Sequence, residues 1–248
     1  MAGKKFKTEA VVLRSIRYGE ADRVLHLYSA HRGRIGAIAK GSRRPRSRFG
    51  GRLEPFFRLS LVLHEGRGDL ATVTAADTVA GYPRLRGSGP ALGAAARACD
   101  AVLRLCDSEE ANPGAYNLLC RYLAILDGED VDPRTSAVDG AAGLPTALAF
   151  RLKLALATGF APELASCARC GETDGLSGFS GAAGGVVCSA CERDGFRLGA
   201  DAHTFLVEAL GKPLAQAPVA GDLALRQAER AISATLEHHA QVQLRAAA

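Results

Sequence analysis

Residues 7–29 read KTEAVVLRSIRYGEADRVLHLYS, two short runs rich in Val, Ile and Leu on either side of a Tyr-Gly turn. Such runs, bounded by turn residues, are typical of β-strands. Three more runs of the same kind follow: RIGAIAKG (34–41), FRLSLVLHEG (57–66) and DLATVTAADTV (69–79). Five strands within about 75 residues predict a small barrel of the OB type. On strand count alone, an SH3-like barrel fits nearly as well.

The hydrophobic pattern changes after Gly81-Tyr82-Pro83, where apolar residues begin to recur every three or four positions up to Cys106. That spacing predicts an amphipathic helix. Asn112-Pro113 supplies the cap and first-turn proline of a second helix.

The rest of the chain continues this helical pattern. Three further helices and one acidic loop are predicted, the helices at about 145–158, 201–211 and 221–245 and the loop at 127–143. The chain is therefore expected to be an α+β protein. Its domains are expected to be an N-terminal barrel, residues 1–81, and a helical domain, residues 82–248.

Four cysteines form the most specific motif of the sequence, C-x2-C-x17-C-x2-C, at Cys167, Cys170, Cys188 and Cys191. Each pair can direct two sulfurs at one ion from a tight turn, and the spacing between the pairs is typical of zinc ribbons. Four thiolates complete a tetrahedron and leave no open position, so one structural Zn²⁺ is predicted. The insertion that carries it is expected at about 164–199. The alternatives are four reduced thiols or a redox pair.

The cysteine count and the N-terminus predict a reducing compartment. Seven cysteines, an odd number, do not suggest a disulfide framework, and MAGKKFKTEA lacks the apolar core of a secretory signal. Cys99, Cys106 and Cys120 are expected to be buried small hydrophobic residues. No apolar run reaches 18 residues, so no membrane span is expected, and a cytoplasmic location is predicted.

Positive charge is concentrated at the start of the chain. Residues 1–60 contain 15 Lys and Arg but only four Asp and Glu, a formal charge of +11, so the remaining residues carry −6 of the total of +5. A basic module joined to an acidic body is the charge distribution of a nucleic-acid-binding protein.

The densest basic segment lies between the predicted third and fourth strands and contains no acidic residue from position 40 to 52. Its Gly, Ser and Pro residues predict a loop. Phe49 lies among these charges, and Phe56 and Phe57 behind it are expected to offer faces on which bases stack. Since no residue is placed to read base edges, binding should be dominated by the phosphate backbone. The alternative is a solvated basic loop with no ligand.

Enzymatic motifs are missing from the sequence. Neither a Walker loop nor an HExxH motif occurs, and no nucleophile–base arrangement is evident. The chain is therefore expected not to be an enzyme.

Three stretches make the chain resemble the RecO family of bacterial recombination mediators: KTEAVVLRSIRYGEADRVLHLYS, GRIGAIAKGSRRPRSRFGGRLEPF and LATGFAPELASCARCG. The resemblance covers nearly the whole chain. It implies an OB-fold domain, a helical domain and, in many members, a four-cysteine zinc site. It also implies binding of single- and double-stranded DNA, annealing of complementary strands and a nucleoid-associated location. With RecR, such proteins help RecA to displace single-strand-binding protein (SSB) from single strands.

The resemblance also suggests residues for these contacts. Basic barrel residues of the family match Arg34 and Lys40, and the charge of the segment extends the predicted DNA surface to Arg43, Arg44, Arg46 and Arg48. The acidic C-terminal tail of SSB is expected to bind an apolar groove of the helical domain with a basic rim, for which the candidates are Arg104, Arg121, Arg151 and Lys153. The final sequence EHHAQVQLRAAA departs from the family's usual ending.

The expected function is thus that of a non-enzymatic DNA-binding mediator of recombinational repair. One alternative is a zinc-ribbon protein of transcription or the ribosome that binds RNA. Another is an enzyme with an unrecognised site in the helical domain.

Overall fold

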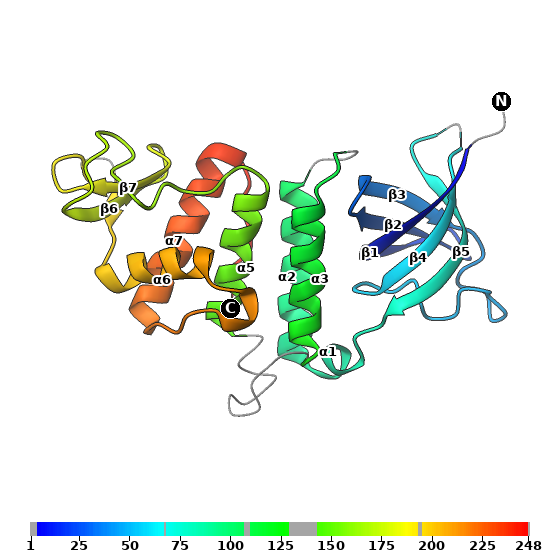
Figure 1. Ribbon diagram of the computed structural model, residues 1–248. Helices are drawn as coiled ribbons and strands as arrows, with labels where there is room; N and C mark the ends of the chain where they lie inside the picture. The colour runs from blue at the N-terminus through cyan, green and yellow to red at the C-terminus, as the bar shows by residue number, and fades with distance from the viewer. Residues whose placement is uncertain (1–3, 67, 107–109, 129–142, 193–194, 248) are drawn as a thin grey trace.

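The computed structural model describes residues 4–66, 68–106, 110–128, 143–192 and 195–247. Five strands occupy the N-terminal part: β1 (Lys5–Tyr18), β2 (Asp22–Ser29), β3 (Gly33–Ala39), β4 (Arg58–His64) and β5 (Ala71–Ala80). They form a closed barrel in the order β1-β2-β3-β5-β4, in which only β3 and β5 pair in parallel. The five predicted strands are thus confirmed (Figure 1).

Every second side chain along the strands points inward, and these side chains fill the barrel. Leu25 and Leu27 of β2 and Leu59, Leu61 and Leu63 of β4 are all fully buried in its core. The segment between β3 and β4 adds Phe49 and Leu53 to the same core, with 1% and 2% of their surfaces exposed. The basic segment is therefore anchored to the barrel by two apolar side chains.

The helical part follows the predicted pattern for most of its length. It consists of α1 (Pro83–Gly87), α2 (Gly89–Leu105), α3 (Pro113–Leu126), α5 (Leu144–Ala157), α6 (Ala200–Gly211), a 3-10 turn η2 (Leu214–Gln216) and α7 (Asp222–Thr235). Asn112 caps α3 as predicted, because its side chain accepts a hydrogen bond from the backbone nitrogen of Ala115. The predicted loop at 127–143 lies largely outside the described residues.

The last helix is shorter than the sequence predicts. Helix α7 continues into one π-helical turn, η3 (Leu236–Ala240), and the helix does not reach residue 245. Gln241 adopts a left-handed conformation (φ 55°), and the backbone nitrogen of Val242 donates to the carbonyl of Leu236. Residues 241–247, called the strap below, then turn away from the helix axis, and Ala247 is buried against the bundle.

Three short strands form a separate sheet near the predicted insertion: β6 (Leu176–Ser180), β7 (Gly185–Cys188) and β8 (Phe196–Arg197), in the order β7-β6-β8. Phe179 and Val186 are buried in the same core as the helices. This small sheet therefore packs on the helical bundle, at the end of the molecule farthest from the barrel (Figure 1).

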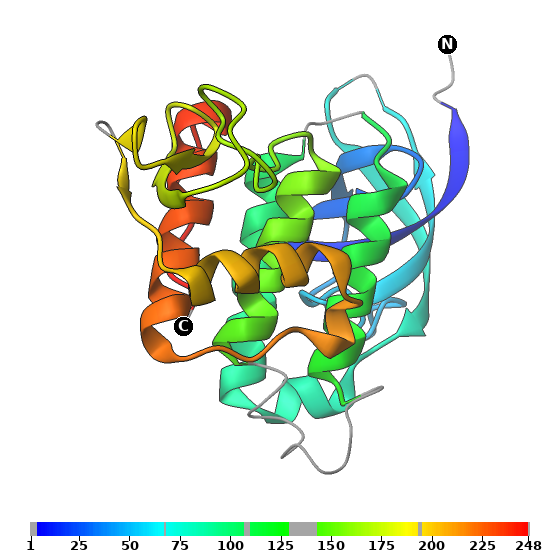
Figure 2. The same ribbon diagram turned by 60° about the vertical axis from the view of Figure 1, so that its left-hand side comes forward.

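Helices α2 and α3 stand between the barrel and the remaining helices, as Figure 2 also shows. Val11, Leu13 and Tyr28 point out of the barrel and join the core of the helical domain. A polar network reinforces this contact: the Tyr116 hydroxyl donates to Glu9 Oε1 at 2.7 Å, and Arg58 Nε donates to the same oxygen at 2.5 Å. The two domains thus share one continuous interface. None of the described helices is long and apolar enough to cross a membrane.

The Glu9 carboxylate at the domain interface should make the free energy of unfolding depend on pH. Burial acts to raise the pKa of Glu9, but hydrogen bonds from Tyr116 and Arg58 outweigh it and leave the pKa below its ordinary value. The stabilisation is therefore complete above the unfolded-state pKa, about 4.3, and is lost as pH falls through the lower folded-state pKa. We expect Glu9→Gln to destabilise the protein more at pH 7 than at pH 3. Urea unfolding at both pH values measures this difference, and an equal loss at both would contradict it.

Candidate metal centre and candidate nucleic-acid interface

The four predicted cysteine ligands converge on one point. The sulfurs of Cys167, Cys170, Cys188 and Cys191 all lie within 4.8 Å of one another, and the Sγ atoms of Cys170 and Cys188 are 3.7 Å apart. Metal–sulfur bonds of about 2.3 Å in a tetrahedron would separate the sulfurs by about 3.8 Å. The four cysteines are thus placed to hold a metal ion, as the spacing predicted.

Local backbone geometry builds each half of this centre. The nitrogen of Gly171 donates to the carbonyl of Cys167 at 2.8 Å, and the nitrogen of Cys191 donates to that of Cys188 at 2.9 Å. Gly171 has a φ of 80°, which glycine adopts without the strain of a side chain. Hydrogen bonds from the backbone, first that of Cys188, lower the pKa of the Cys167 thiol. The thiolate is therefore favoured at Cys167, whereas hydrogen bonds with neighbouring thiols, first that of Cys170, raise the pKa of Cys191.

The other three cysteines are buried, as predicted. Cys99, Cys106 and Cys120 contribute to the core of the helical domain, and each is at most 9% exposed. Burial raises the pKa of the Cys99 and Cys120 thiols. Such thiols are unreactive, so these residues act as small core side chains.

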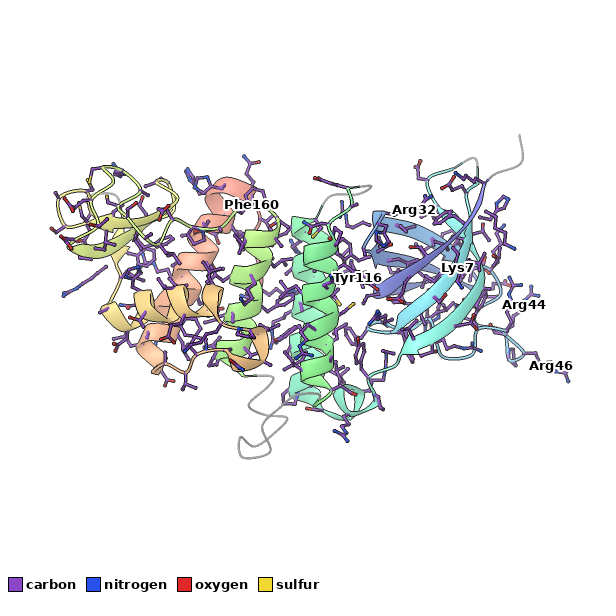
Figure 3. All side chains as sticks on the ribbon, in the orientation of Figure 1. Lys7, Arg32, Arg44, Arg46, Tyr116 and Phe160 are labelled. Atoms are coloured by element: carbon purple, nitrogen blue, oxygen red, sulfur yellow. The ribbon has the colours of Figure 1, made fainter. Side chains whose placement is uncertain are left out.

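The basic segment lies on the side of the barrel away from the helical domain, and Arg44 and Arg46 project outward from it (Figure 3). Five of its cationic side chains are exposed: Lys40, Arg43, Arg44, Arg46 and Arg48. Within the described part of the chain, none of these five forms an ion pair. Their charges are therefore available to an anionic ligand.

The start of the segment is held against the β1–β2 turn. The backbone nitrogen of Gly41 donates to Asp22 Oδ1 at 2.7 Å, and that of Arg43 donates to the carbonyl of Ala21 at 2.8 Å. The Arg43 guanidinium also donates to the carbonyl of Gly19 at 3.2 Å. Residues far apart in the sequence are thereby joined into one surface.

Of the two predicted stacking faces, Phe56 is buried, so the prediction is wrong there, and Phe57 is only partly exposed. Phe49 is buried in the barrel core, and Phe56 is 9% exposed against the helical domain. Phe57 is half-buried, and the Arg86 guanidinium lies 4.0 Å from the centre of its ring. Hydrophobic burial outweighed exposure at Phe49 and Phe56, although charged residues lie nearby in the sequence.

Arg34 is not brought together with the other predicted DNA-contacting residues. Its guanidinium donates to the carbonyl of Leu103 in α2 at 2.6 Å, and its side chain is only partly exposed. This position lies at the interface between the domains. The exposed cations of the basic segment lie at the other end of the barrel wall.

The sequence interpretation missed Tyr18, the aromatic side chain most open to solvent. It is 58% exposed at the end of β1, beside the turn that Arg43 contacts, and Ile16 on the same face is 42% exposed. All other Tyr and Phe side chains are buried or half-buried. The signal was its place before the β1–β2 turn, since this loop binds oligonucleotides in OB-type barrels.

The four basic residues named as rim candidates lie in different surroundings in the helical domain. Arg104 pairs with Asp100 at 2.8 Å, and Lys153 Nζ donates to the carbonyl of Leu210 at 2.8 Å. Arg151 is only 5% exposed and lies 3.4 Å from Glu229. Arg121 is exposed on α3. All four candidates thus already have interaction partners in the protein.

Comparison with known proteins gives a consistent result along the chain. Residues 1–82 match the family described as "Recombination protein O N terminal", and residues 86–247 match "Recombination protein O C terminal". The chain is 36% identical to a protein of Anaeromyxobacter sp. (strain K) named DNA repair protein RecO, over 95% of this chain and 91% of the relative. A protein of the same name from Rubrobacter xylanophilus is 39% identical over 76% of this chain and 72% of the relative. One from Geobacter sulfurreducens is 35% identical over 83% and 80%.

Proposed function

Because this chain belongs to the RecO family of DNA repair proteins, we propose that it is a DNA-binding mediator of recombinational repair. In this proposal it binds single- and double-stranded DNA and anneals complementary strands. Together with RecR it helps to load RecA onto strands coated with SSB. These partners come from the family resemblance, and the protein acts without catalysing a reaction.

The barrel supports a DNA-binding role for the N-terminal domain. Its five strands close in the order β1-β2-β3-β5-β4, which favours the OB type over the SH3-like alternative. OB barrels bind oligonucleotides on the face of strands 2 and 3 and on the adjoining loops. Here α2 and α3 cover one end of that face, so the open end near Tyr18 is the part available to a ligand.

One observation carries the proposal: an exposed aromatic ring lies beside a cluster of unpaired cations. Tyr18 offers a face for one base, and Arg43, which donates to the carbonyl of the adjacent Gly19, brings the basic segment to the same turn. Stacking accepts any base, and arginine–phosphate contacts carry no sequence information. Binding of this kind does not depend on the base sequence of the nucleic acid. By neutralising phosphates it also lowers the repulsion between two strands that anneal.

We propose Zn²⁺ as the metal held by the cysteine cluster. Four sulfur donors at tetrahedral separation suit zinc and leave no position for water or substrate. Bound zinc would cross-link the turns that carry Cys167 and Cys188, and its role would be structural.

The proposal is tested by annealing complementary DNA strands coated with SSB. The wild-type protein should accelerate annealing, and Tyr18→Ala should weaken single-strand binding by about tenfold, since stacking contributes about 1–3 kcal/mol per base. Tyr18→Phe, which keeps the ring, should bind nearly as well as the wild type.

Two results would favour other functions. Tighter binding to RNA than to single-stranded DNA of equal length would favour the zinc-ribbon RNA-binding alternative. Turnover of a nucleotide substrate would favour the enzyme alternative. Failure to anneal coated strands would contradict the proposal.

A further inference from the structure

A groove of about 550 Å³ lies between the barrel and the helical domain. Its walls come from β1, from the segment that precedes β4, from α2 and from the strap, and they include Leu13, Arg14, Phe56, Arg97, Asp100 and Arg245. None of these residues belongs to the surface around Tyr18 or to the metal centre. The groove is therefore distinct from the metal centre and adds residues beyond those around Tyr18.

Positive charge in this groove is not compensated. Arg14, Arg97 and Arg245 form no ion pair with any residue that the structure describes. The single acidic side chain of the lining, Asp100, already accepts a hydrogen bond from Arg104 at 2.8 Å. Leu13 and Phe56 form the floor of the groove, with 5% and 9% of their surfaces exposed. A ligand with repeated negative charges would match the three unpaired arginines.

A buried ion pair holds the strap, and with it Arg245, in place. Arg151 lies 3.4 Å from Glu229 and donates to the carbonyl of Arg245. The carboxylate of Glu229 in turn accepts from the backbone nitrogen of Ala247 at 2.6 Å. Ala247 is 1% exposed. The strap therefore presents Arg245, which lines the groove, from a fixed backbone.

The groove is continuous with the surface around Tyr18. Arg14, Ile16 and Tyr18 alternate along β1 and share its outer face, and their partners on β2 are His26, Val24 and Asp22. Four residues of a strand span about 13 Å. A single strand bound at Tyr18 thus meets exposed Ile16 and then Arg14, where the groove begins.

We infer that this groove binds the backbone of a single-stranded nucleic acid that continues past Tyr18. Arg14, Arg97 and Arg245 contact its phosphates. The inference rests on the proposed function and extends it to a second contact region on the helical domain. The bound length of a strand then depends on both domains.

Oligothymidylates of about 4 to 20 nucleotides, which bracket the site sizes of OB folds, provide the test. The double variant Arg97→Ala/Arg245→Ala should bind the long oligonucleotides about 25-fold more weakly at 0.1 M salt, and its salt slope should flatten by about 1.4, since each phosphate contact contributes about 0.7. Its affinity should also stop rising at a shorter length than that of the wild type. Arg226→Ala removes an exposed arginine of α7 outside the groove and should change neither quantity.

Melting curves control for folding, and Arg245→Ala alone removes an exposed side chain with little effect on packing. If Tyr18→Ala weakens binding but the groove variants bind like the wild type, the groove inference is overturned and the proposed function stands. If the groove variants no longer bind an acidic peptide but still bind DNA, the groove is a binding site for an acidic protein segment. The inference is then also overturned. If the wild type binds no single-stranded DNA, both proposals fail.

Discussion

Cys188→Ser is expected to release the metal and to lower the melting temperature by about 10 °C or more. Structural zinc contributes about 10–16 kcal/mol in isolated finger peptides. In a chain of this size, each kcal/mol shifts the melting temperature by about 2–4 °C. The effect should spread beyond the cysteines, because Phe179 and Val186 of the same small sheet are buried in the core of the helical domain. Elemental analysis, together with a thermal melt, measures both parts of this result.

Cys99→Ser is the matched control for the loss of a thiol. Cys99 is 2% exposed and lies outside the cluster, so its replacement should cost about 1–3 kcal/mol for a buried hydroxyl and leave the metal content at about one per chain. A folded Cys188→Ser protein without metal and with an unchanged melting temperature would contradict a structural metal.

Replacing Arg43, Arg44 and Arg46 together by alanine should weaken binding to single-stranded DNA by about a hundredfold at 0.1 M salt. Each phosphate contact contributes about 0.7 to the log–log salt slope of a single strand. Four to six contacts would give the wild type a slope of roughly −3 to −4, and the triple variant should flatten it by about two. Affinity measured at several salt concentrations tests this expectation.

The same substitutions should leave folding almost unchanged. All three side chains are exposed, and the bond from Arg43 to the carbonyl of Gly19 is the one hydrogen bond that the structure shows for their guanidinium groups. The anchoring role belongs to Phe49 and Leu53, which stay in place.

A control variant removes the same charge from the helical domain through Arg197→Ala, Lys212→Ala and Arg226→Ala. If DNA binding depends on net charge alone, both triple variants will lose affinity equally. If the basic segment is merely solvated, neither affinity nor slope will change in the Arg43/Arg44/Arg46 variant. Either outcome would contradict the proposal that the basic segment is the DNA-binding surface.

The sequence by itself determined most of the helices, the strands of the barrel and the clustering of the four cysteines. The short runs rich in Val, Ile and Leu within 7–80 predicted all five barrel strands, and Asn112-Pro113 predicted the start of α3. The Cys-x-x-Cys spacing predicted the convergence of four sulfurs. These features depend on short apolar runs, on helix capping and on turns of two to four residues. Neighbours in the chain are sufficient to establish them.

Only the tertiary structure decided which side chains remain available to a ligand. Phe49 lies among arginines in the sequence but is buried in the barrel, and Arg34 turns to the carbonyl of Leu103. The groove joins Arg14, Arg97 and Arg245, which lie on three segments far apart in the chain. Burial and hydrogen bonding at these positions depend on which distant segments pack together. Local periodicity carries no information about that pairing, so the sequence could locate the charges but not the surface they form.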